Sequence, residues 1–483
     1  MSAGEVVLGV DIGTTSTKVL VVDAHGTEVA EHRVPTTWTT RSGWSETSAE
    51  ALLAATLTAV DGALAAAAVS LGHHPQVAGL GVCGMGESGV LLGDDGSVRA
   101  PVLAWFDPRG TDELASLPAE VRDAYAATTG LPVSPLSTLA KLLWLREQGV
   151  RLEQGCWLNV PEYVAHRLGA ERASEPSLAS RTGLLDQSAG TPWLAALDAL
   201  GAGSDLLPPS LPAGTSLGRA AGELPRGLAG AVLVVAGHDH PAASFGAGAW
   251  GQEDLFDSCG TAESVLRVVS RPLTGEQRGA LVSRGLTAGA HVLEDRQVVA
   301  GPTKSGIVLR RVLAMLGATD AAARDALDSS WAAGRRDAGV TVAGATMADE
   351  EVVVRAVGDD IAPADVWAAA LAHVSATVAA LVQSIDAEVG PRRAVVAAGG
   401  WTRMASVRAQ KLLTLPDVTF SPRQQAGAFG AATFAAWAAA GRSGTAVDFA
   451  AGFVPDAAQP SAESTPAGTT RRHHTAPTQG AFA

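Results

Sequence analysis

The chain has 483 residues, which is too long for one ordinary domain, so we expect two or three domains that each bury a core. Its 49 acidic residues outnumber 35 lysines and arginines, and the formal net charge of −14 argues against a general nucleic-acid binder. We expect no secretory signal, no membrane span and, with three scattered cysteines, no disulfide framework, so the composition predicts a reduced, cytoplasmic α/β protein.

The first hundred residues read as short strands around one long helix. An Ala- and Leu-rich segment at 50–70 has helical spacing. Strands are predicted at residues 6–10, 19–22, 28–34, 77–82 and 90–92. The chain therefore opens with a β-hairpin whose tip is small, polar and glycine-bearing.

The rest of the chain repeats this theme after a mostly helical stretch at 112–200. Further strands are predicted at 231–236, 254–258, 264–269 and 394–397, and further helices at 305–316, 364–388, 404–413 and 427–440. We predict an N-terminal domain over 1–248, a C-terminal domain over 249–455, and a disordered tail, rich in Pro and Thr, over 456–483.

Residues 11–18, Asp-Ile-Gly-Thr-Thr-Ser-Thr-Lys, link the first two predicted strands. A tip of small polar residues gathers backbone N–H groups and hydroxyls in a concavity that suits phosphate oxygens. Asp11 is placed to hold Mg²⁺ directly or through water, and Lys18 adds a positive charge beside the same phosphates. A plain polar turn is the alternative, but the flanking strands with an acid at the first strand's end favour a phosphate site.

Two later segments are of a related kind. Residues 257–263 place an acid, small polar residues, a glycine and Thr261 between two predicted strands, which indicates a nucleotide held between two related domains. Gly399 and Gly400 follow a strand and precede a helix, where a backbone without side chains lets adenine or ribose approach.

Residues 237–240, Gly-His-Asp-His, end the buried strand that precedes the domain boundary. A carboxylate there is well placed as a general base, which phosphoryl transfer to an alcohol needs together with Mg²⁺. A metal site is the alternative. On an extended chain, however, His238 and His240 share a face that Asp239 opposes, and no third ligand is evident.

Taken together, these motifs resemble those of the FGGY carbohydrate kinases, within the superfamily of actin-like ATPases. The matching segments are 11–18 and 257–261 for the two phosphate motifs, 398–403 with 427–432 for the adenosine motif, 105–109 for the W-x-D-x-R sugar-site signature, and 237–240 for the strand end with the catalytic aspartate. Their order and spacing cover roughly residues 1–445.

The resemblance implies an α/β fold of two actin-like (ribonuclease H-like) domains, each a mixed β-sheet flanked by helices, with an ATP cleft between them. It implies Asp239 as the catalytic base and Asp11 as the residue near Mg²⁺. The implied contacts to the ATP phosphates are Thr14, Thr15, Ser16, Lys18, Gly260 and Thr261, and those to adenosine are Gly399, Gly400 and Arg403. The implied acceptor site is formed by Glu87, Trp105, Asp107, Arg109, Asp239 and His240.

Three positions depart from the family pattern. Glu87 falls where xylulokinases carry a histidine, and it resembles the acid of the Arg-Glu pair that grips a polyol in glycerol kinases, although Gly86 replaces that arginine. His240 stands where Asn or Gln is common. Trp401 stands where a third glycine is usual, which leaves the nucleotide preference open.

We therefore predict ATP-dependent phosphorylation of a ketose, such as a xylulose-like pentulose, at a primary hydroxyl. A polyol kinase acting on a glycerol- or erythritol-like acceptor is the alternative, favoured by Glu87. A non-catalytic sugar-binding protein is less favoured, because Asp11, Asp239 and Thr261 are all present. A chaperone-like ATPase is less favoured, because residues 105–109 match a sugar site and we see no large peptide-binding extension. The expected cofactors are ATP and Mg²⁺. The expected partner is a small sugar or polyol, without nucleic acid or membrane, and assembly as a homodimer is left open.

Overall fold

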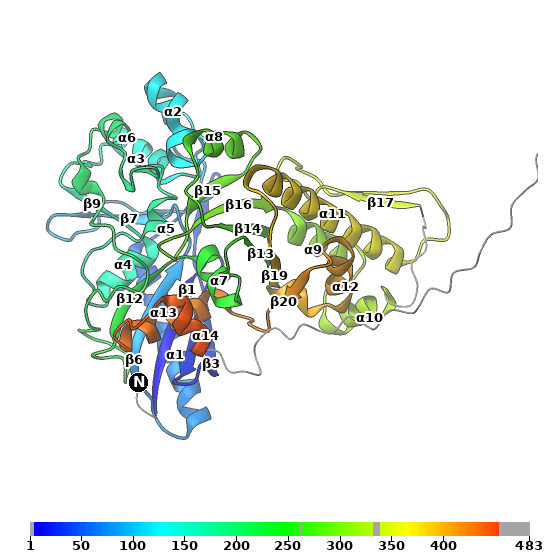
Figure 1. The fold of residues 1–483 in the computed structure, drawn as a ribbon, viewed down its shortest axis with the longest axis horizontal. Coiled ribbons are helices and arrows are strands. Elements are labelled where there is room, and N and C mark those ends of the chain that lie inside the picture. The colour runs from blue at the N-terminus through cyan, green and yellow to red at the C-terminus, as the bar shows by residue number, and fades with distance from the viewer. Residues whose placement is uncertain (1–3, 261, 332–338, 454–483) are drawn as a thin grey trace, which may run out of the picture.

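Two lobes, each built on a mixed β-sheet, make up the computed structural model, which describes residues 4–260, 262–331 and 339–453 (Figure 1). The predicted tail at 456–483 and Thr261 lie outside the described residues. The first sheet and the helices beside it are β1 (Glu5–Ile12), β2 (Ser16–Asp23), β3 (Glu28–Pro35), α1 (Ala49–Leu71), β6 (Gln76–Gly84), α4 (Val160–Arg167), β12 (Val232–His238) and α7 (Asp239–Ala247).

The second lobe holds the larger sheet. Its elements are β13 (Asp254–Cys259), β14 (Glu263–Val269), α8 (Gly275–Ser283), β15 (Thr287–Ala290), β16 (Gln297–Thr303), α9 (Ser305–Met315), α10 (Ala321–Trp331), β17 (Val340–Ala343), β18 (Val353–Ala356), α11 (Pro363–Val389), β19 (Ala394–Ala398), η3 (Gly400–Arg403), α12 (Ala405–Thr414) and β20 (Val418–Phe420). Two further helices follow, α13 (Ala426–Ala439) and α14 (Ala446–Phe453).

The two sheets share five strands of the same arrangement. The first has the order β12-β6-β1-β2-β3 and the second the order β15-β16-β14-β13-β19-β20. In each, an antiparallel hairpin (β1–β2 or β13–β14) is extended on one side by two parallel strands and on the other by an antiparallel strand, and the second sheet adds antiparallel β15 beyond β16. The predicted pair of related α/β domains with mixed sheets is therefore confirmed.

A layer of short elements is inserted between β3 and β12 on the first lobe. It comprises β4 (Thr39–Arg41), β5 (Trp44–Thr47), β7 (Gly89–Gly93), β8 (Val102–Leu103), η1 (Glu113–Ser116), α2 (Ala119–Thr129), α3 (Thr138–Glu147), β9 (Gly155–Asn159), α5 (Pro176–Ala179), β10 (Leu185–Asp186), β11 (Thr191–Pro192), α6 (Leu194–Leu200) and η2 (Ser204–Leu206). The prediction of a mostly helical region at 112–200 missed β9, which pairs with β7.

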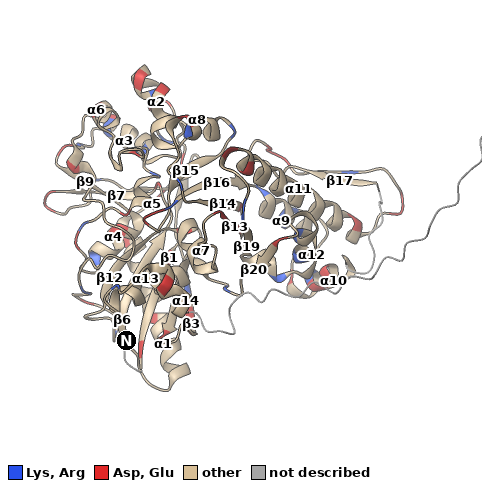
Figure 2. Ribbon diagram, in the orientation of Figure 1, with Lys and Arg blue, Asp and Glu red and all other residues tan. Residues whose placement is uncertain are grey.

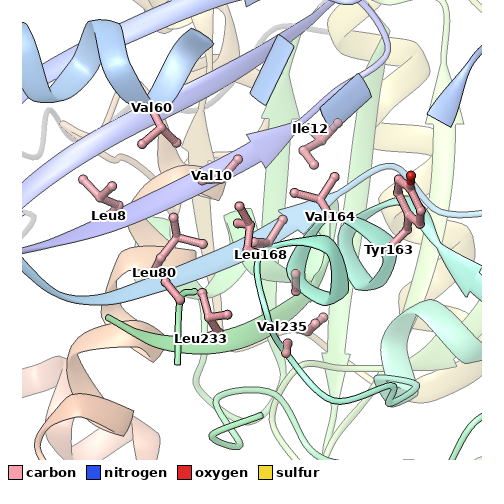
Figure 3. Packing of buried hydrophobic residues seen from close by; sticks show 14 of the residues in the cluster. Leu8, Val10, Ile12, Val60, Leu80, Tyr163, Val164, Leu168, Leu233 and Val235 are labelled. Carbon is pink, nitrogen blue, oxygen red and sulfur yellow. The ribbon is translucent and has the colours of Figure 1, made fainter. Parts of the chain in front are cut away.

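Side chains of β1 alternate between the two faces of the first sheet. Leu8, Val10 and Ile12 pack with α1 and α4, and with Leu80 of β6 (Figure 3). Val7, on the opposite face, packs with α7 and α13. The same alternation puts Asp11 on the α7 and α13 face, where its carboxylate lies beside Gly427.

Helix α13 corrects the predicted domain boundary. We assigned it to the C-terminal domain over 249–455, yet its apolar residues pack with strands of the first sheet. Glycines allow this close approach: a Cβ atom at Gly9 would lie 1.7 Å from the carbonyl oxygen of Ala428, and one at Gly81 would lie 2.1 Å from that of Ala431. The chain thus returns to its first lobe after completing the second.

Helices α1 and α11 are long and apolar enough, by length and composition alone, to cross a membrane, which our reading of the sequence did not expect. Helix α1 begins after Ser48, whose side chain accepts a hydrogen bond from the backbone N–H of Ala51, and ends at Gly72 with φ 74°. One face, including Leu52 and Val60, is buried against the first sheet. In the structure, each of the two helices buries one face in a protein core.

Charged residues lie over both lobes, mostly on helices and loops rather than in the sheets (Figure 2). Asp11 and Asp257 are exceptions, because they lie near the ends of central strands of the two sheets and are almost fully buried. Buried carboxylates need a compensating partner, so these strand ends are where a functional site is expected.

Candidate functional site

A cavity of about 800 Å³ lies between the two lobes. The predicted site residues on its wall are Asp11, Thr15, Ser16, Lys18, Asp239, His240, Gly260, Gly399, Gly400 and Arg403. Other predicted site residues of the described chain are not on this wall, namely Thr14, Glu87, Trp105, Asp107 and Arg109. The three segments that we predicted to hold a nucleotide therefore meet at one cleft with the strand end that carries Asp239, although the first and the last of them are hundreds of residues apart.

The β1–β2 hairpin presents its tip to this cavity. Asp11 and Lys18 are directly paired in the register of the two strands, and Lys18 Nζ lies 3.2 Å from Asp11 Oδ2. The charge of Asp11 raises the pKa of Lys18, so this lysine is a cation at neutral pH. Thr14 is held in place by Trp105, whose Nε1 donates a hydrogen bond of 2.8 Å to the hydroxyl of Thr14. Trp105 thus braces the hairpin, and its predicted contact with the acceptor stays a prediction.

The second carboxylate oxygen of Asp11 fits the predicted cation. Asp11 Oδ1 is buried and has no hydrogen-bond partner among the described residues. Asp11 lines the cavity, and a carboxylate oxygen without a protein partner is a suitable ligand for Mg²⁺, directly or through a water molecule. Mg²⁺ held there would offset the negative charge of a bound triphosphate.

A buried cluster of charged side chains holds the β13–β14 turn. Lys411, on α12, lies 2.5 Å from Asp257 Oδ2 and also contacts Glu263. Burial alone would lower the pKa of Lys411, but the surrounding charges, Asp257 first among them, raise it well above its usual value. The pKa of Glu263 is raised to about 7 by burial, and Asp257 adds to the shift. This cluster sets the position of Gly260 on the cavity wall, and our sequence analysis did not identify Lys411.

The turn after β19 forms the part of the wall that we predicted for adenosine. Gly399 has φ 119°, and a Cβ atom there would lie 2.5 Å from the carbonyl oxygen of Cys259, so only glycine fits. Trp401 lines the cavity and also packs into the core beside Met404. Arg403 donates a hydrogen bond of 2.7 Å to Gln424.

Three arginines on the cavity wall were missed by the sequence analysis. Arg33, Arg310 and Arg324 come from β3, α9 and α10, and they bring positive charge to the mouth of the cavity in an acidic protein. No motif surrounds any of them, so only the fold shows that they face the same space. Their charge suits a polyanionic ligand.

Asp239 is the first residue of α7, so the chain turns into a helix at the residue where we expected an extended strand end. This corrects the predicted alternation of faces. The two imidazoles both point at one oxygen of Asp239: His238 Nε2 lies 3.1 Å and His240 Nδ1 2.9 Å from Oδ1. Burial alone would raise the pKa of Asp239, but His240 and then His238 hold it well below its usual range.

A buried network behind Asp239 holds this turn. The hydroxyl of Ser177 accepts a hydrogen bond of 2.9 Å from the backbone N–H of His238 and donates one to Glu175. Gly237 leaves room for this contact, because a Cβ atom there would lie 2.5 Å from the hydroxyl oxygen of Ser177. The pKa of Glu175 is raised to about 8, chiefly by burial, with a further contribution from the charge of Glu162.

Replacing Glu175 by glutamine is expected to flatten the pH dependence of stability. The pKa of this carboxyl is higher in the folded chain than in the unfolded chain. Below about pH 4.5 the group is protonated in both states and does not change the free energy of unfolding. Between about pH 4.5 and pH 8 only the unfolded chain releases the proton readily, so the free energy of unfolding falls as the pH rises. Urea unfolding of the wild type should therefore show a loss of stability between pH 5 and pH 8, and Glu175→Gln should reduce that loss by on the order of 3 kcal/mol. Glu120→Gln, at an exposed site on α2, is the control, and equal slopes in all three proteins would refute a buried, proton-holding Glu175.

Glu87 lies beside the same turn and is paired with an arginine that the sequence analysis did not single out. Arg181 contacts Glu87 Oε1 through Nε at 2.7 Å and through Nη2 at 2.6 Å, and its Nη1 lies 3.3 Å from the hydroxyl of Thr287 on β15. Gly86 leaves space for this arginine, because a Cβ atom there would lie 3.1 Å from Arg181 Cγ. Glu87 itself has φ 63°, an uncommon conformation for a residue other than glycine, and such strain is typical of functional turns.

Asp107 and Arg109 form an ion pair away from the cavity wall. Asp107 is fully buried and pairs with Arg109 Nη2 at 2.8 Å, while Arg109 also pairs with Glu46 and lies over the rings of Trp44 and Trp144. The pair is saturated by protein contacts and has no surface towards the cavity. The pair holds the segment that carries Trp105, and the predicted contact of the two side chains with an acceptor stays a prediction.

Comparison with known proteins relates the chain to one family of kinases. A model of the FGGY family of carbohydrate kinases, N-terminal domain, matches residues 6–246. An L-fuculokinase of Salmonella typhi is 30% identical over 268 residues, 53% of this chain and 55% of that protein. A xylulose kinase of Klebsiella pneumoniae is 32% identical over 193 residues, 39% of this chain and 36% of that protein. The chain thus spans about half the length, or less, of these curated relatives.

The solved structures agree over a longer span. The crystal structure of xylulose kinase from Rhodospirillum rubrum superposes with a TM-score of 0.77 at 24% sequence identity, and the match covers 92% of each chain. At this identity the likeness shows the fold, and it confirms the predicted pair of actin-like domains.

Proposed function

We propose, because the chain belongs to the FGGY family of carbohydrate kinases, that it transfers the γ-phosphoryl group of ATP to a hydroxyl of a small sugar or polyol in the cytoplasm. The observation that carries this proposal is that Asp11, Lys18, Gly260, Gly399 and Asp239 line one cavity between two lobes. Phosphoryl transfer depends mainly on positioning and charge neutralisation, and a two-lobed cleft with charged strand ends supplies both.

On the donor side, the hairpin tip and the second turn approach the same space from opposite lobes. In this proposal Thr14, Thr15, Ser16 and Lys18 meet the phosphates from the first lobe, and Gly260 with Thr261 meets them from the second. Gly399, Gly400 and Arg403 would hold the adenosine, and Asp11 would hold Mg²⁺. Closure of the lobes over the nucleotide would exclude water, which otherwise competes with the alcohol for the phosphoryl group.

On the acceptor side, Asp239 and His240 lie between the cavity and the ion pair of Glu87 with Arg181. We propose a ketose acceptor phosphorylated at a primary hydroxyl, as the names of the two curated relatives suggest. A polyol such as glycerol or erythritol is the second candidate, because a paired arginine and glutamate offer both donors and acceptors to neighbouring hydroxyls.

A panel of acceptors at fixed ATP and Mg²⁺ tests the proposal, with ADP release as the readout. ADP formed only with pentuloses or hexuloses supports the ketose kinase, and ADP formed only with polyols supports the alternative. ADP release that no acceptor changes would instead indicate a chaperone-like ATPase, and binding of sugar and nucleotide without any ADP would indicate a non-catalytic binding protein.

Replacing Arg181 by alanine is expected to weaken acceptor binding without changing nucleotide binding. A charge-assisted hydrogen bond contributes about 1.5–3 kcal/mol, so the KM for the acceptor should rise by about 10–100-fold, while the Kd for ATP should change by less than about 2-fold. Arg122→Ala, at an exposed site on α2, is the control for removal of an arginine. An unchanged KM for the acceptor in a folded Arg181→Ala protein would show that the Glu87–Arg181 pair lies outside the acceptor site.

A further inference from the structure

Arg33 lies in line with Asp11 and Lys18 across three strands of the first sheet. The register pairs Asp11 with Lys18, and it pairs Lys18 with Arg33 on β3. Residues that are opposite each other in antiparallel strands point to the same face of the sheet, so Arg33 points to the face on which the other two line the cavity. Arg33 is part of the same wall. The cavity therefore receives a second cation from the first lobe, from outside the motif at 11–18.

Strand β3 runs alongside the hairpin tip between β1 and β2. Pro35, the last residue of β3, pairs with Ser16, and the backbone N–H of Thr36 donates a hydrogen bond of 3.1 Å to the carbonyl oxygen of Thr15. Arg33 precedes Pro35 by two residues, which is about 7 Å along a strand. An extended arginine side chain spans about this distance. A phosphate chain that meets the hairpin tip is thus within reach of the Arg33 guanidinium.

The guanidinium of Arg33 has no partner in the protein. Lys18 Nζ is held 3.2 Å from Asp11 Oδ2, whereas the side chain of Arg33 makes no hydrogen bond or ion pair with any residue that the structure describes. The side chain is exposed, so the guanidinium is hydrated and needs no partner for stability. Its planar donors match two oxygens of one phosphate group. Arg33 is therefore a cation that a phosphate can engage without breaking an existing contact.

The cavity wall is positively charged although the chain is acidic. Within the described residues the wall carries five lysines and arginines against three aspartates, while the whole chain has a formal net charge of −14. The cations are Lys18, Arg33, Arg310, Arg324 and Arg403, and the aspartates are Asp11, Asp239 and Asp325. A positive wall on an acidic protein attracts a polyanion to this cavity. Lys18 and Arg33 are the two cations of this wall that come from the first lobe, beside the hairpin tip.

We propose that the guanidinium of Arg33 binds the phosphate chain of the nucleotide, next to Lys18 and the hairpin tip. The proposal rests on the proposed kinase function and adds to it a phosphate-binding residue that no motif marks. Arg33 takes no proton and forms no covalent bond in the reaction. Its charge offsets that of the phosphates, and its two donors orient the chain for in-line transfer.

Protection of a sheet edge is the other explanation for a charged residue at this position. Strand β3 is the last strand of the first sheet, and edge strands commonly carry charged side chains that prevent pairing with other chains. Glu31 and His32 on the same strand are exposed as well. Edge protection does not require that Arg33 lie on the cavity wall in register with Lys18. It also predicts that nucleotide binding is unchanged when Arg33 is replaced.

Arg33→Gln tests the proposal, because glutamine keeps hydrogen-bonding groups at this position but removes the charge. Calorimetric titration in the presence of Mg²⁺ gives the Kd for AMP-PNP, a non-hydrolysable ATP analogue, and the Kd for adenosine, which has no phosphate. We expect the Kd for AMP-PNP to rise by about 10-fold, as for the loss of one charge-assisted hydrogen bond, and the Kd for adenosine to change by less than about 2-fold. In steady state the KM for ATP should rise while the KM for the acceptor stays the same.

Two further variants separate the charge from the side chain. Arg33→Lys keeps the positive charge and should restore part of the affinity for AMP-PNP, although lysine cannot bind two oxygens in the same way. Arg41→Gln is the matched control, because Arg41 is an exposed arginine on the short strand β4 and is not part of the cavity wall. Its Kd values for AMP-PNP and adenosine should both stay within about 2-fold of wild type.

The outcomes distinguish this proposal from the kinase proposal. A Kd for AMP-PNP within about 2-fold of wild type in Arg33→Gln would overturn the role of Arg33 and leave the proposed kinase function intact. An equal rise in the Kd for adenosine and for AMP-PNP would also overturn it, since the residue would then shape the site without contacting the phosphates. A wild type that binds no AMP-PNP would overturn the proposed function itself, and the role of Arg33 with it.

Discussion

Asp239→Asn is expected to lower kcat by about 10²–10⁴-fold while nucleotide binding is retained. In the proposed reaction the Asp239 carboxylate, on the cavity wall, takes the proton of the acceptor hydroxyl, and an asparagine amide cannot accept that proton. The substitution removes a charge without changing the size of the side chain, so the fold and the cavity should persist. Steady-state ADP release with a saturating acceptor measures the first effect, and calorimetric titration with ATP and Mg²⁺ measures the second.

Asp61→Asn is the matched control for this variant. Asp61 is exposed on α1, away from the cavity, and its replacement should leave kcat within about 2-fold of wild type. Turnover near the wild-type level in Asp239→Asn would refute any role of Asp239 in proton removal. Loss of ATP binding in the same variant would show instead that the carboxylate organises the nucleotide site.

The site could be predicted where its residues are close in sequence and sit at strand ends. The tip between β1 and β2, the turn after β13, the turn after β19 and the end of β12 were all placed correctly, because alternating apolar runs that stop at Gly, Thr or Asp mark strand ends. Strands that end at one edge of a sheet bring their last residues together, so four short motifs implied one cleft.

The remaining contacts depend on chain segments that are far apart in the sequence. Arg181 contacts Glu87 because the inserted layer folds back over the first sheet. Lys411 contacts Asp257 because α12 packs under the second sheet. Neither residue has a local pattern that distinguishes it from a solvated surface charge. Helix α13 is a related case: its alanine-rich sequence predicts a buried helix, but only Gly9 and Gly81, more than 340 residues earlier, show which sheet it packs against.

The W-x-D-x-R segment combines a predicted sugar contact, which stays a prediction, with a structural role. Asp107 and Arg109 form an ion pair inside the protein. A buried, bidentate pair of this kind fixes the course of the chain, and the side chain that it presents, Trp105, braces Thr14 at the hairpin tip. A motif can thus mark a site while only some of its residues reach the ligand.

Lys411→Met is expected to destabilise the fold by about 3–5 kcal/mol, because it leaves Asp257 and Glu263 buried without their cation. Urea unfolding measures the loss. It should be smaller at pH 5.5 than at pH 8, since Glu263, whose pKa is already raised to about 7 in the wild type, takes up a proton at the lower pH. Because the cluster carries the β13–β14 turn, any folded Lys411→Met protein should also bind ATP more weakly.

Two comparisons separate this electrostatic cause from a simple packing defect. Arg408→Met removes an exposed cation from the same helix, where it lies over the ring of Phe420, and should cost less than about 1 kcal/mol. The triple variant Asp257→Asn/Glu263→Gln/Lys411→Met replaces all three charges by neutral groups of similar size, and it should recover part of the stability lost in Lys411→Met. If the triple variant is no more stable than Lys411→Met at pH 8, the loss comes from packing, and the buried charges do not set the position of the turn.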